Sequence, residues 1–346
     1  MIQPARQTDI DTLRALACIA LVSFHVVGYT PQSGMELPAG HPLHLLQAGL
    51  TPLRMPLFIF LSGVVFCTGV DRFEAVPRRL VSKARRLLLP LGCVGSLFWL
   101  TLALTGREVG PFGAFLWQPF AHFWYLQASF AIMGTALGLL ALCHGRVVPA
   151  AMALAVLGLA GGALLPDWVG NPFAIRQAMV FAPFFAAGLV WRAVAMPALA
   201  GAAQERAVGL AMVSLAILTG YAAALEIMPL TRTGAQMVGI LGCAGLMLAA
   251  PRHAGLARLG RSSYAVYLFH VFFTAGTLMG LDRFWSGGPV AAVYGLALVA
   301  GLSGPVMLER VLLAVPVLKV LCLGLRVHAP VPQRPARAPR EALSAA

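Results

Sequence analysis

Residues 10–29 read IDTLRALACIALVSFHVVGY, a stretch built mainly of Leu, Ala, Val, Ile and Phe. A helix needs about 20 mostly apolar residues to cross the hydrocarbon core of a bilayer. The stretch contains Arg14 and His25 and is followed by no small-x-small cleavage site, unlike a removable signal peptide. It therefore predicts a first membrane-spanning helix.

Similar apolar stretches recur along the chain with only short polar breaks between them. We expect about ten spans, at 10–29, 54–71, 87–105, 122–143, 147–165, 173–192, 207–226, 233–250, 263–281 and 289–315. The composition agrees, because 59% of the 346 residues are hydrophobic and 11% are charged, whereas an ordinary soluble domain has about 25% charged residues. The sequence predicts an all-α, polytopic integral membrane protein in which residues 1–325 form one membrane-embedded domain.

The basic residues predict how this domain is oriented. Most of them fall at the chain ends and after the second, fourth, sixth and eighth expected spans, which share one face of the membrane. They are Arg6, Arg72, Arg78, Arg79, Lys83, Arg85, Arg86, Arg146, Arg192, Arg206, Arg252, Arg258, Arg261, Lys319, Arg326, Arg334, Arg337 and Arg340. Because Lys and Arg are enriched on the cytoplasmic side, both termini are predicted to be cytoplasmic. Residues 326–346 are rich in Pro, Ala and Arg, which predicts a disordered basic cytoplasmic tail.

Other classes of protein fit the sequence poorly. The net charge of +13 does not indicate nucleic-acid binding, since no soluble fold displays the basic residues among exposed aromatics. The six cysteines lie singly in apolar stretches and form no CxxC pair, which argues against a disulfide framework or a zinc site. Glu36, His41 and His44 have a loose metal-ligand spacing without a fourth ligand, so a solvated loop is favoured and no metal site is predicted.

Arg14 and His25 are the sharpest functional signal. Eleven positions are close to three helical turns, so the two side chains lie on nearly one face, ~16 Å apart along the axis. Ionisable side chains at such depths are costly and usually line a cavity or a functional path. Two structural alternatives remain: Arg14 can reach the interface and pair with Asp11, and His25 can be a neutral histidine bonded to a neighbouring helix.

Four further segments contain candidate functional residues. The stretch MPLFIFLSG at 55–63 contains Ser62, although small residues commonly serve close helix packing. A basic segment over 78–86 contains Arg85 and Arg86 and either sets the topology or binds phosphates. HFWYL at 122–126 contains Trp124, an aromatic of the kind that often anchors a helix at the interface. LGRSSYAVYLFH at 259–270 ends in His270, a second candidate for a buried polar residue.

Together these segments resemble the acyltransferase 3 family of integral membrane O-acyltransferases, in the same order and over nearly the whole chain. Arg14 and His25 correspond to the hallmark Arg and His of that family. The other matching positions are Phe58, Phe60, Ser62, Gly63, Arg86, Pro90, Trp124, Leu126, Ser263, Tyr267, Leu268 and His270. The chain departs from the family pattern where Ile59 displaces an aromatic and where the spacing from Arg86 to Pro90 is one residue longer.

The resemblance implies transfer of an acyl group, usually acetyl, from coenzyme A to a hydroxyl of a cell-envelope carbohydrate or glycolipid in a bacterial inner membrane. Its partners would be the acyl-CoA donor, the glycan acceptor and the bilayer, with acetyl-CoA as co-substrate and no permanently bound cofactor. The expected catalytic residues are His25 and Arg14. The residues expected to contact donor or acceptor are Asp11, Ser62, Arg85, Arg86, Trp124 and His270. His25 would act as a general base or carry the acyl group itself, and the sequence leaves both routes open.

The competing interpretation is a transporter or flippase of a glycan, lipid or small polar molecule. A bundle of about ten helices with a few buried charges also suits transport. Chemical turnover separates the two classes, because a transporter would move an unmodified substrate and ignore acetyl-CoA.

Overall fold

The computed structural model describes residues 4–28, 34–38, 40–66, 68–166, 169–198 and 202–326, and these ranges contain helices and connections but no strand. The tail expected from residue 326 onward lies almost wholly outside the described residues. The long helices are α1 (Pro4–Val27), α3 (Thr51–Val64), α4 (Val76–Leu104), α5 (Trp124–Leu142), α6 (Val147–Leu164), α7 (Ile175–Val190), α9 (Ala203–Ala224), α10 (Arg232–Ala249), α12 (Ser263–Phe284) and α13 (Val290–Ala314). The short helical elements are α2 (Pro42–Gly49), η1 (Phe73–Ala75), η2 (Ala114–Leu116), η3 (Ala121–Phe123), η5 (Pro172–Ala174), η6 (Trp191–Ala195), α8 (Met196–Ala198), α11 (Ala254–Arg261) and α14 (Pro316–Leu323).

The architecture confirms the prediction of an all-α, polytopic membrane protein. In the described chain, 9 helical segments are long and apolar enough to cross a membrane. The remaining expected span, 233–250, coincides with α10 (18 residues), which begins at Arg232 and contains Gln236. These two polar side chains lower its hydropathy, and α10 is not among the 9 segments.

Two helix boundaries differ from those expected from the sequence. The span expected at 54–71 ends at Val64 and is preceded by α2, so that the apolar segment covers Pro42–Val64. His41 lies at the start of α2, where its Nδ1 accepts a hydrogen bond from the Leu43 backbone N–H (3.2 Å). The basic segment at 78–86 is not a connection but forms the first turns of α4, where Pro77 suits the beginning of a helix.

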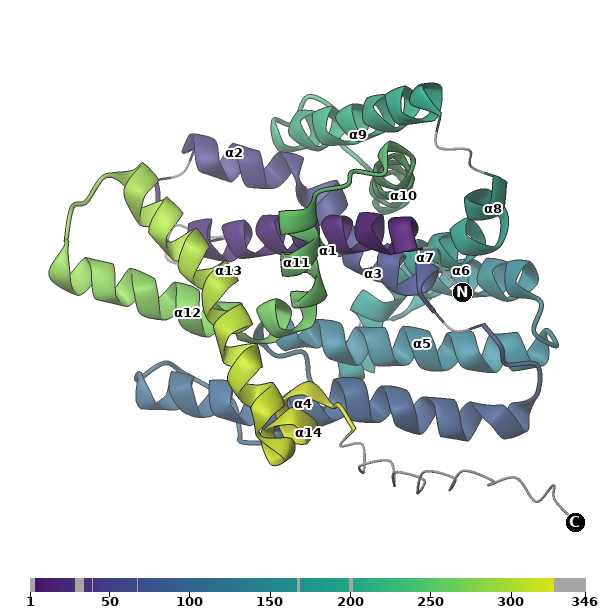
Figure 1. Ribbon diagram of the computed structural model, residues 1–346, viewed down its shortest axis with the longest axis horizontal. Coiled ribbons are helices and arrows are strands. Elements are labelled where there is room, and N and C mark those ends of the chain that lie inside the picture. The colour runs from purple at the N-terminus through teal and green to yellow at the C-terminus, as the bar shows by residue number, and fades with distance from the viewer. Residues whose placement is uncertain are drawn as a thin grey trace, which may run out of the picture.

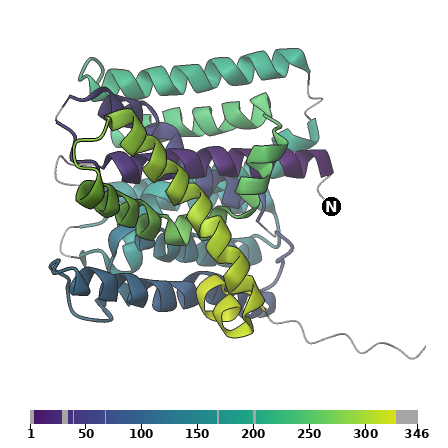
Figure 2. The ribbon, with the colours of Figure 1, turned by 60° about the vertical axis from the view of Figure 1, so that its left-hand side comes forward.

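Helix α1 lies at the centre of the bundle. It packs against α3, α11, α12 and α13. In Figures 1 and 2, α9 and α10 lie on one side of α1, and α4 and α5 lie on the other. Consistent with this place, 67% of its apolar window is buried, compared with 17% of the corresponding window of α13. Four of its polar residues, Asp9, Asp11, Thr12 and Ser23, are accordingly buried in the protein.

The beginnings of α1, α4 and α9 lie toward the same end of the bundle, on the right in Figure 1. Several of the basic residues that the sequence assigns to one face of the membrane lie at these helix beginnings. Which side of the membrane this end faces stays a prediction from the distribution of Lys and Arg.

Close helix crossings depend on glycine at two places near the site. At Gly63 an added Cβ would collide with the carbonyl oxygen of Phe185, so this glycine lets α3 and α7 meet backbone to backbone. At Gly260 an added Cβ would collide with the carbonyl oxygen of Asp11, so α11 lies directly against the first turns of α1.

Candidate active site

Three histidines from distant parts of the chain meet inside the bundle. His25 lies in the last turn of α1, His122 in η3 and His270 in α12. The ring centroids of His25 and His270 are 4.8 Å apart, those of His122 and His270 are 5.1 Å apart, and those of His25 and His122 are 6.0 Å apart. His122 and His270 are buried, whereas His25 is half-buried. We call these three residues the histidine cluster.

Backbone contacts determine the tautomer of His270. Its Nδ1 lies 2.9 Å from the carbonyl oxygens of both Val266 and Tyr267, so this nitrogen carries the hydrogen. In neutral His270 the Nε2 atom is then an acceptor, and it is buried without a hydrogen-bond partner among the described residues. The cluster therefore contains one fixed, unprotonated imidazole nitrogen.

His122 is held in place by α12. Its Nε2 lies 3.4 Å from the Leu268 carbonyl oxygen, and the Tyr267 hydroxyl donates to the His122 carbonyl oxygen (2.6 Å). These two contacts fasten the turn before α5 to the same helix that carries His270. The relative positions of His122 and His270 are thus set by backbone groups.

His25 differs from both, because its side chain makes no hydrogen bond with any residue that the structure describes. Its neighbours are rings: those of His122, His270 and Phe24, the last at a centroid distance of 5.3 Å. Within the described chain, neither of its ring nitrogens is taken up by a hydrogen bond. A general base or a nucleophile requires this freedom.

Arg14 pairs with Asp11, as in the structural alternative that the sequence left open. Its Nη1 lies 3.0 Å from Asp11 Oδ1, one turn earlier in α1, and about a third of its side chain (31%) is exposed. Both Arg14 and His25 belong to α1, so helix geometry places them ~16 Å apart along its axis. They do not touch, and they can only contact two different parts of one extended ligand or path.

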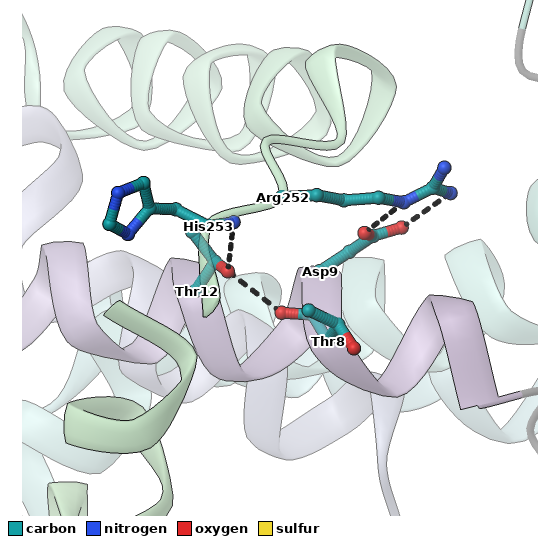
Figure 3. A network of polar contacts seen from close by, with 5 residues as sticks. All are labelled: Thr8, Asp9, Thr12, Arg252 and His253. Carbon is teal, nitrogen blue, oxygen red and sulfur yellow. Dashed lines mark hydrogen bonds and ion pairs between the residues drawn. The ribbon is translucent and has the colours of Figure 1, made fainter. Parts of the chain in front are cut away.

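The first turns of α1 are fixed to the connection between α10 and α11 (Figure 3). Arg252 binds Asp9 through two contacts, Nε to Oδ1 (2.5 Å) and Nη2 to Oδ2 (3.1 Å). The His253 backbone N–H donates to Thr12 Oγ1 (3.3 Å), and that hydroxyl donates to the Thr8 carbonyl oxygen (2.8 Å). These contacts set the position of the turn that carries Asp11 and Arg14.

Ser62 and Trp124 lie close to an aromatic group that connects α3, α5 and α12. The Ser62 hydroxyl donates to the Phe58 carbonyl oxygen (2.8 Å) within α3 and lies beside the Tyr125 hydroxyl. The Tyr125 ring lies 5.1 Å from that of Tyr267. Trp124 stacks on Phe181 at 5.6 Å. Tyr125 therefore lies between Ser62 and Tyr267, the residue that holds His122. Trp124 packs toward α7 instead.

Arg85 and Arg86 already have protein partners at the end of α14. Arg85 Nε donates to the Gly324 carbonyl oxygen (3.3 Å), and Arg86 Nη1 donates to the Leu323 carbonyl oxygen. The Arg86 guanidinium also lies over the Tyr264 ring, 4.1 Å from its centroid. Both arginines thus join α4 to α14. Arg78 and Arg79, earlier in α4, are exposed and bond to no other described residue.

The sequence resemblance is supported by a direct comparison. The family model described as an acyltransferase domain (acyltransferase 3) matches residues 7–310, most of the chain. The chain belongs to the acyltransferase 3 family. This acyltransferase carries all of its predicted site residues within the matched range. No curated protein and no solved structure matches it.

Sequence reasoning found part of the cluster of this acyltransferase. It predicted His25 and His270, and the structure brings these two side chains together. It did not single out His122, although the residue opens the HFWYL segment, because aromatic segments at helix entries are usually interfacial anchors. It did not single out Arg54 either. In the described ranges no group of three His, Cys, Asp or Glu side chains is arranged to hold a metal ion.

Proposed function

We propose that this acyltransferase moves an acyl group, most often acetyl, from coenzyme A to a hydroxyl of a cell-envelope carbohydrate or glycolipid in a bacterial inner membrane, and that His25 is the reacting side chain. One observation carries the proposal: His25 is the half-buried member of the histidine cluster and bonds to no described residue. Family membership supplies the class of reaction.

Two routes suit the imidazole of His25. As a general base, His25 takes the proton of the acceptor hydroxyl while the oxygen attacks the thioester carbonyl, and the departing thiolate then receives that proton. As a nucleophile, His25 attacks the thioester itself, releases the thiol and transfers the acyl group from its ring to the acceptor. Both routes use one free nitrogen of His25.

His270 is proposed to orient this imidazole. Its Nε2 is unprotonated and unbonded, and its ring is the closer of the two histidine neighbours of His25. If one ring nitrogen of His25 donates its hydrogen to His270 Nε2, the other ring nitrogen of His25 is left as the acceptor. His270 then acts as a positioning residue, as in other sites where a base is held by a third group.

We assign binding of the acyl-CoA donor to the end of α1 that lies away from His25. Arg14, held by Asp11, and the exposed Arg78 and Arg79 offer guanidinium groups that match phosphate oxygens. The ~16 Å between Arg14 and His25 is comparable to the reach of a pantetheine arm. In this proposal Arg85 and Arg86 contribute by holding the start of α4 against α14, and Ser62 and Trp124 contribute to the wall beside the cluster.

The test is turnover by purified protein in nanodiscs, supplied with acetyl-CoA and envelope glycolipid extract. Wild type should release free thiol and form acetylated product, and His25→Ala should lower kcat by at least about 100-fold. His144→Ala is the matched control, because His144 is exposed in the turn after α5. Full activity of a folded His25→Ala protein would exclude His25 as the reacting group. Transport of unmodified substrate without thiol release would contradict the proposed function.

A further inference from the structure

Two polar side chains outside the histidine cluster lie against the last turns of α1. Gln47 in α2 and Arg54 in α3 both point to α1, and Gln47 is only 4% exposed. Gln47 Nε2 donates to Ser23 Oγ (2.7 Å), and the guanidinium of Arg54 lies over the Phe24 ring, 3.6 Å from its centroid. Gln47 and Arg54 therefore contact the two residues that directly precede His25 in the sequence.

Each of these side chains leaves one buried polar atom without a partner. Gln47 Oε1 and Arg54 Nη1 are buried and form no hydrogen bond with the part of the chain that the structure describes. Arg54 also forms no ion pair with a described residue, and its contact with the Phe24 ring does not satisfy Nη1. Folded proteins leave few buried polar groups unpaired, and an unpaired buried charge is especially costly. A ligand that satisfies both atoms is the simplest explanation for their retention.

The two orphan atoms define the chemistry of that ligand. Gln47 Oε1 can only accept a hydrogen bond, so it requires a hydroxyl or N–H donor. Arg54 Nη1 donates from a planar, permanently charged group that matches a carboxylate or phosphate. A sugar that carries both hydroxyls and an acidic group satisfies the pair.

The position favours the acceptor over the donor. Gln47 and Arg54 contact Ser23 and Phe24 at one end of α1, whereas the Asp11–Arg14 pair lies near its other end. A donor bound at Arg14 with its thioester at His25 would leave the space beyond His25 for the second substrate. Ser23 extends this polar surface, because its hydroxyl lies 2.7 Å from the Tyr294 hydroxyl of α13.

We propose that Gln47 and Arg54 form the acceptor subsite of this acyltransferase, and that the subsite selects a negatively charged carbohydrate. This inference rests on the proposed function, because it assigns the acceptor side of the same site. A hydroxyl of the sugar donates to Gln47 Oε1, and its acidic group pairs with Arg54. A further hydroxyl then lies beside His25, where it can be acylated.

The probe is a matched pair of soluble sugars, methyl β-D-glucuronoside and methyl β-D-glucoside, which differ in a carboxylate in place of a hydroxymethyl group. Their apparent Kd values are read from the thermal stabilisation of purified protein in detergent. Wild type should bind the glucuronoside about ten-fold more tightly or better, as expected for one charge-assisted contact. Arg54→Gln should reduce this preference to about two-fold or less.

Two controls keep the test decisive. Arg107→Gln removes an exposed arginine between α4 and η2 and should keep the wild-type preference. Arg54→Lys keeps the charge without the planar fork and should show an intermediate preference, which serves if Arg54→Gln does not fold. Equal affinity for the two glycosides, no binding of either by wild type, or an unchanged preference in Arg54→Gln would overturn the inference.

The measurement is separate from catalysis. Turnover of acetyl-CoA without a preference for the glucuronoside would contradict the acidic subsite alone. A preference for the glucuronoside without turnover would contradict the proposed function alone.

Discussion

The imidazole rings of His25 and His270 lie 4.8 Å apart, although one belongs to the first helix and the other to α12. His270 is fixed by hydrogen bonds from its Nδ1 to the carbonyl oxygens of Val266 and Tyr267, whereas His25 bonds to none of the residues that the structure describes. The pair thus consists of one anchored imidazole and one that is free to engage a substrate.

The anchored partner gives the first prediction. His270→Gln should lower kcat by about 100-fold through misplacement of His25, with little change in the KM for acetyl-CoA or for the acceptor. Steady-state kinetics with both substrates varied would check this division. A change confined to KM would instead make His270 a binding residue.

The free imidazole gives the second prediction, which separates the two catalytic routes. If His25 carries the acyl group, acetyl-CoA without acceptor should release about one thiol per protein and add one acetyl group to a peptide containing His25. Rapid acid quench and peptide mass spectrometry would detect that adduct. If His25 is a general base, neither the burst nor the adduct should form, and His25→Ala provides the background.

The crossing of α1 and α11 gives the third prediction. Gly260→Ala should lower the midpoint of thermal unfolding and reduce activity, because the new Cβ would collide with the Asp11 carbonyl oxygen and displace the turn that holds Arg14. Gly276→Ala in α12 is the control, since nothing lies within 4 Å of its added Cβ. In that control the free energy of unfolding should stay unchanged or rise by up to about 1 kcal/mol, because Ala has a higher helix propensity than Gly. Equal effects of the two substitutions would contradict the close contact.

The unpaired guanidinium of Arg54 gives the fourth prediction. Arg54→Met should raise the unfolding temperature of the ligand-free protein, because it removes a half-buried charge that has no counter-ion among the described residues and keeps the contact with Phe24. A lower unfolding temperature would show that Arg54 stabilises the fold in a way that its described contacts do not explain. Differential scanning fluorimetry in detergent is sufficient for this comparison.

Much of this fold could be predicted from local sequence, because a transmembrane helix depends mainly on a run of apolar residues. Arg14 and His25 were found for the same reason, since ionisable residues stand out within such a run. Helix α2 was not predicted, because its 8 residues are too few to indicate a membrane span by themselves. Its continuity with α3 shows only in three dimensions.

The parts of the site that could not be predicted depend on contacts between distant segments. His122 looked interfacial, but contacts with Phe98, Tyr267 and Leu268, all distant in the sequence, help to bury it. The basic segment suggested a phosphate site, whereas the partners of Arg85 and Arg86 are carbonyl oxygens at the end of α14. Neither partner can be inferred from spacing, because residues far along the chain supply it.

The histidine cluster has a consequence for how the protein is made. Its members come from α1, η3 and α12, so the ribosome must synthesise and the membrane must receive most of the chain before all three imidazoles can meet. Until α12 is inserted, His25 and His122 lack the helix that holds them together. Nascent or truncated chains that end before residue 263 should therefore be catalytically silent. Activity should return if the missing C-terminal helices are supplied as a separate fragment that inserts and docks correctly.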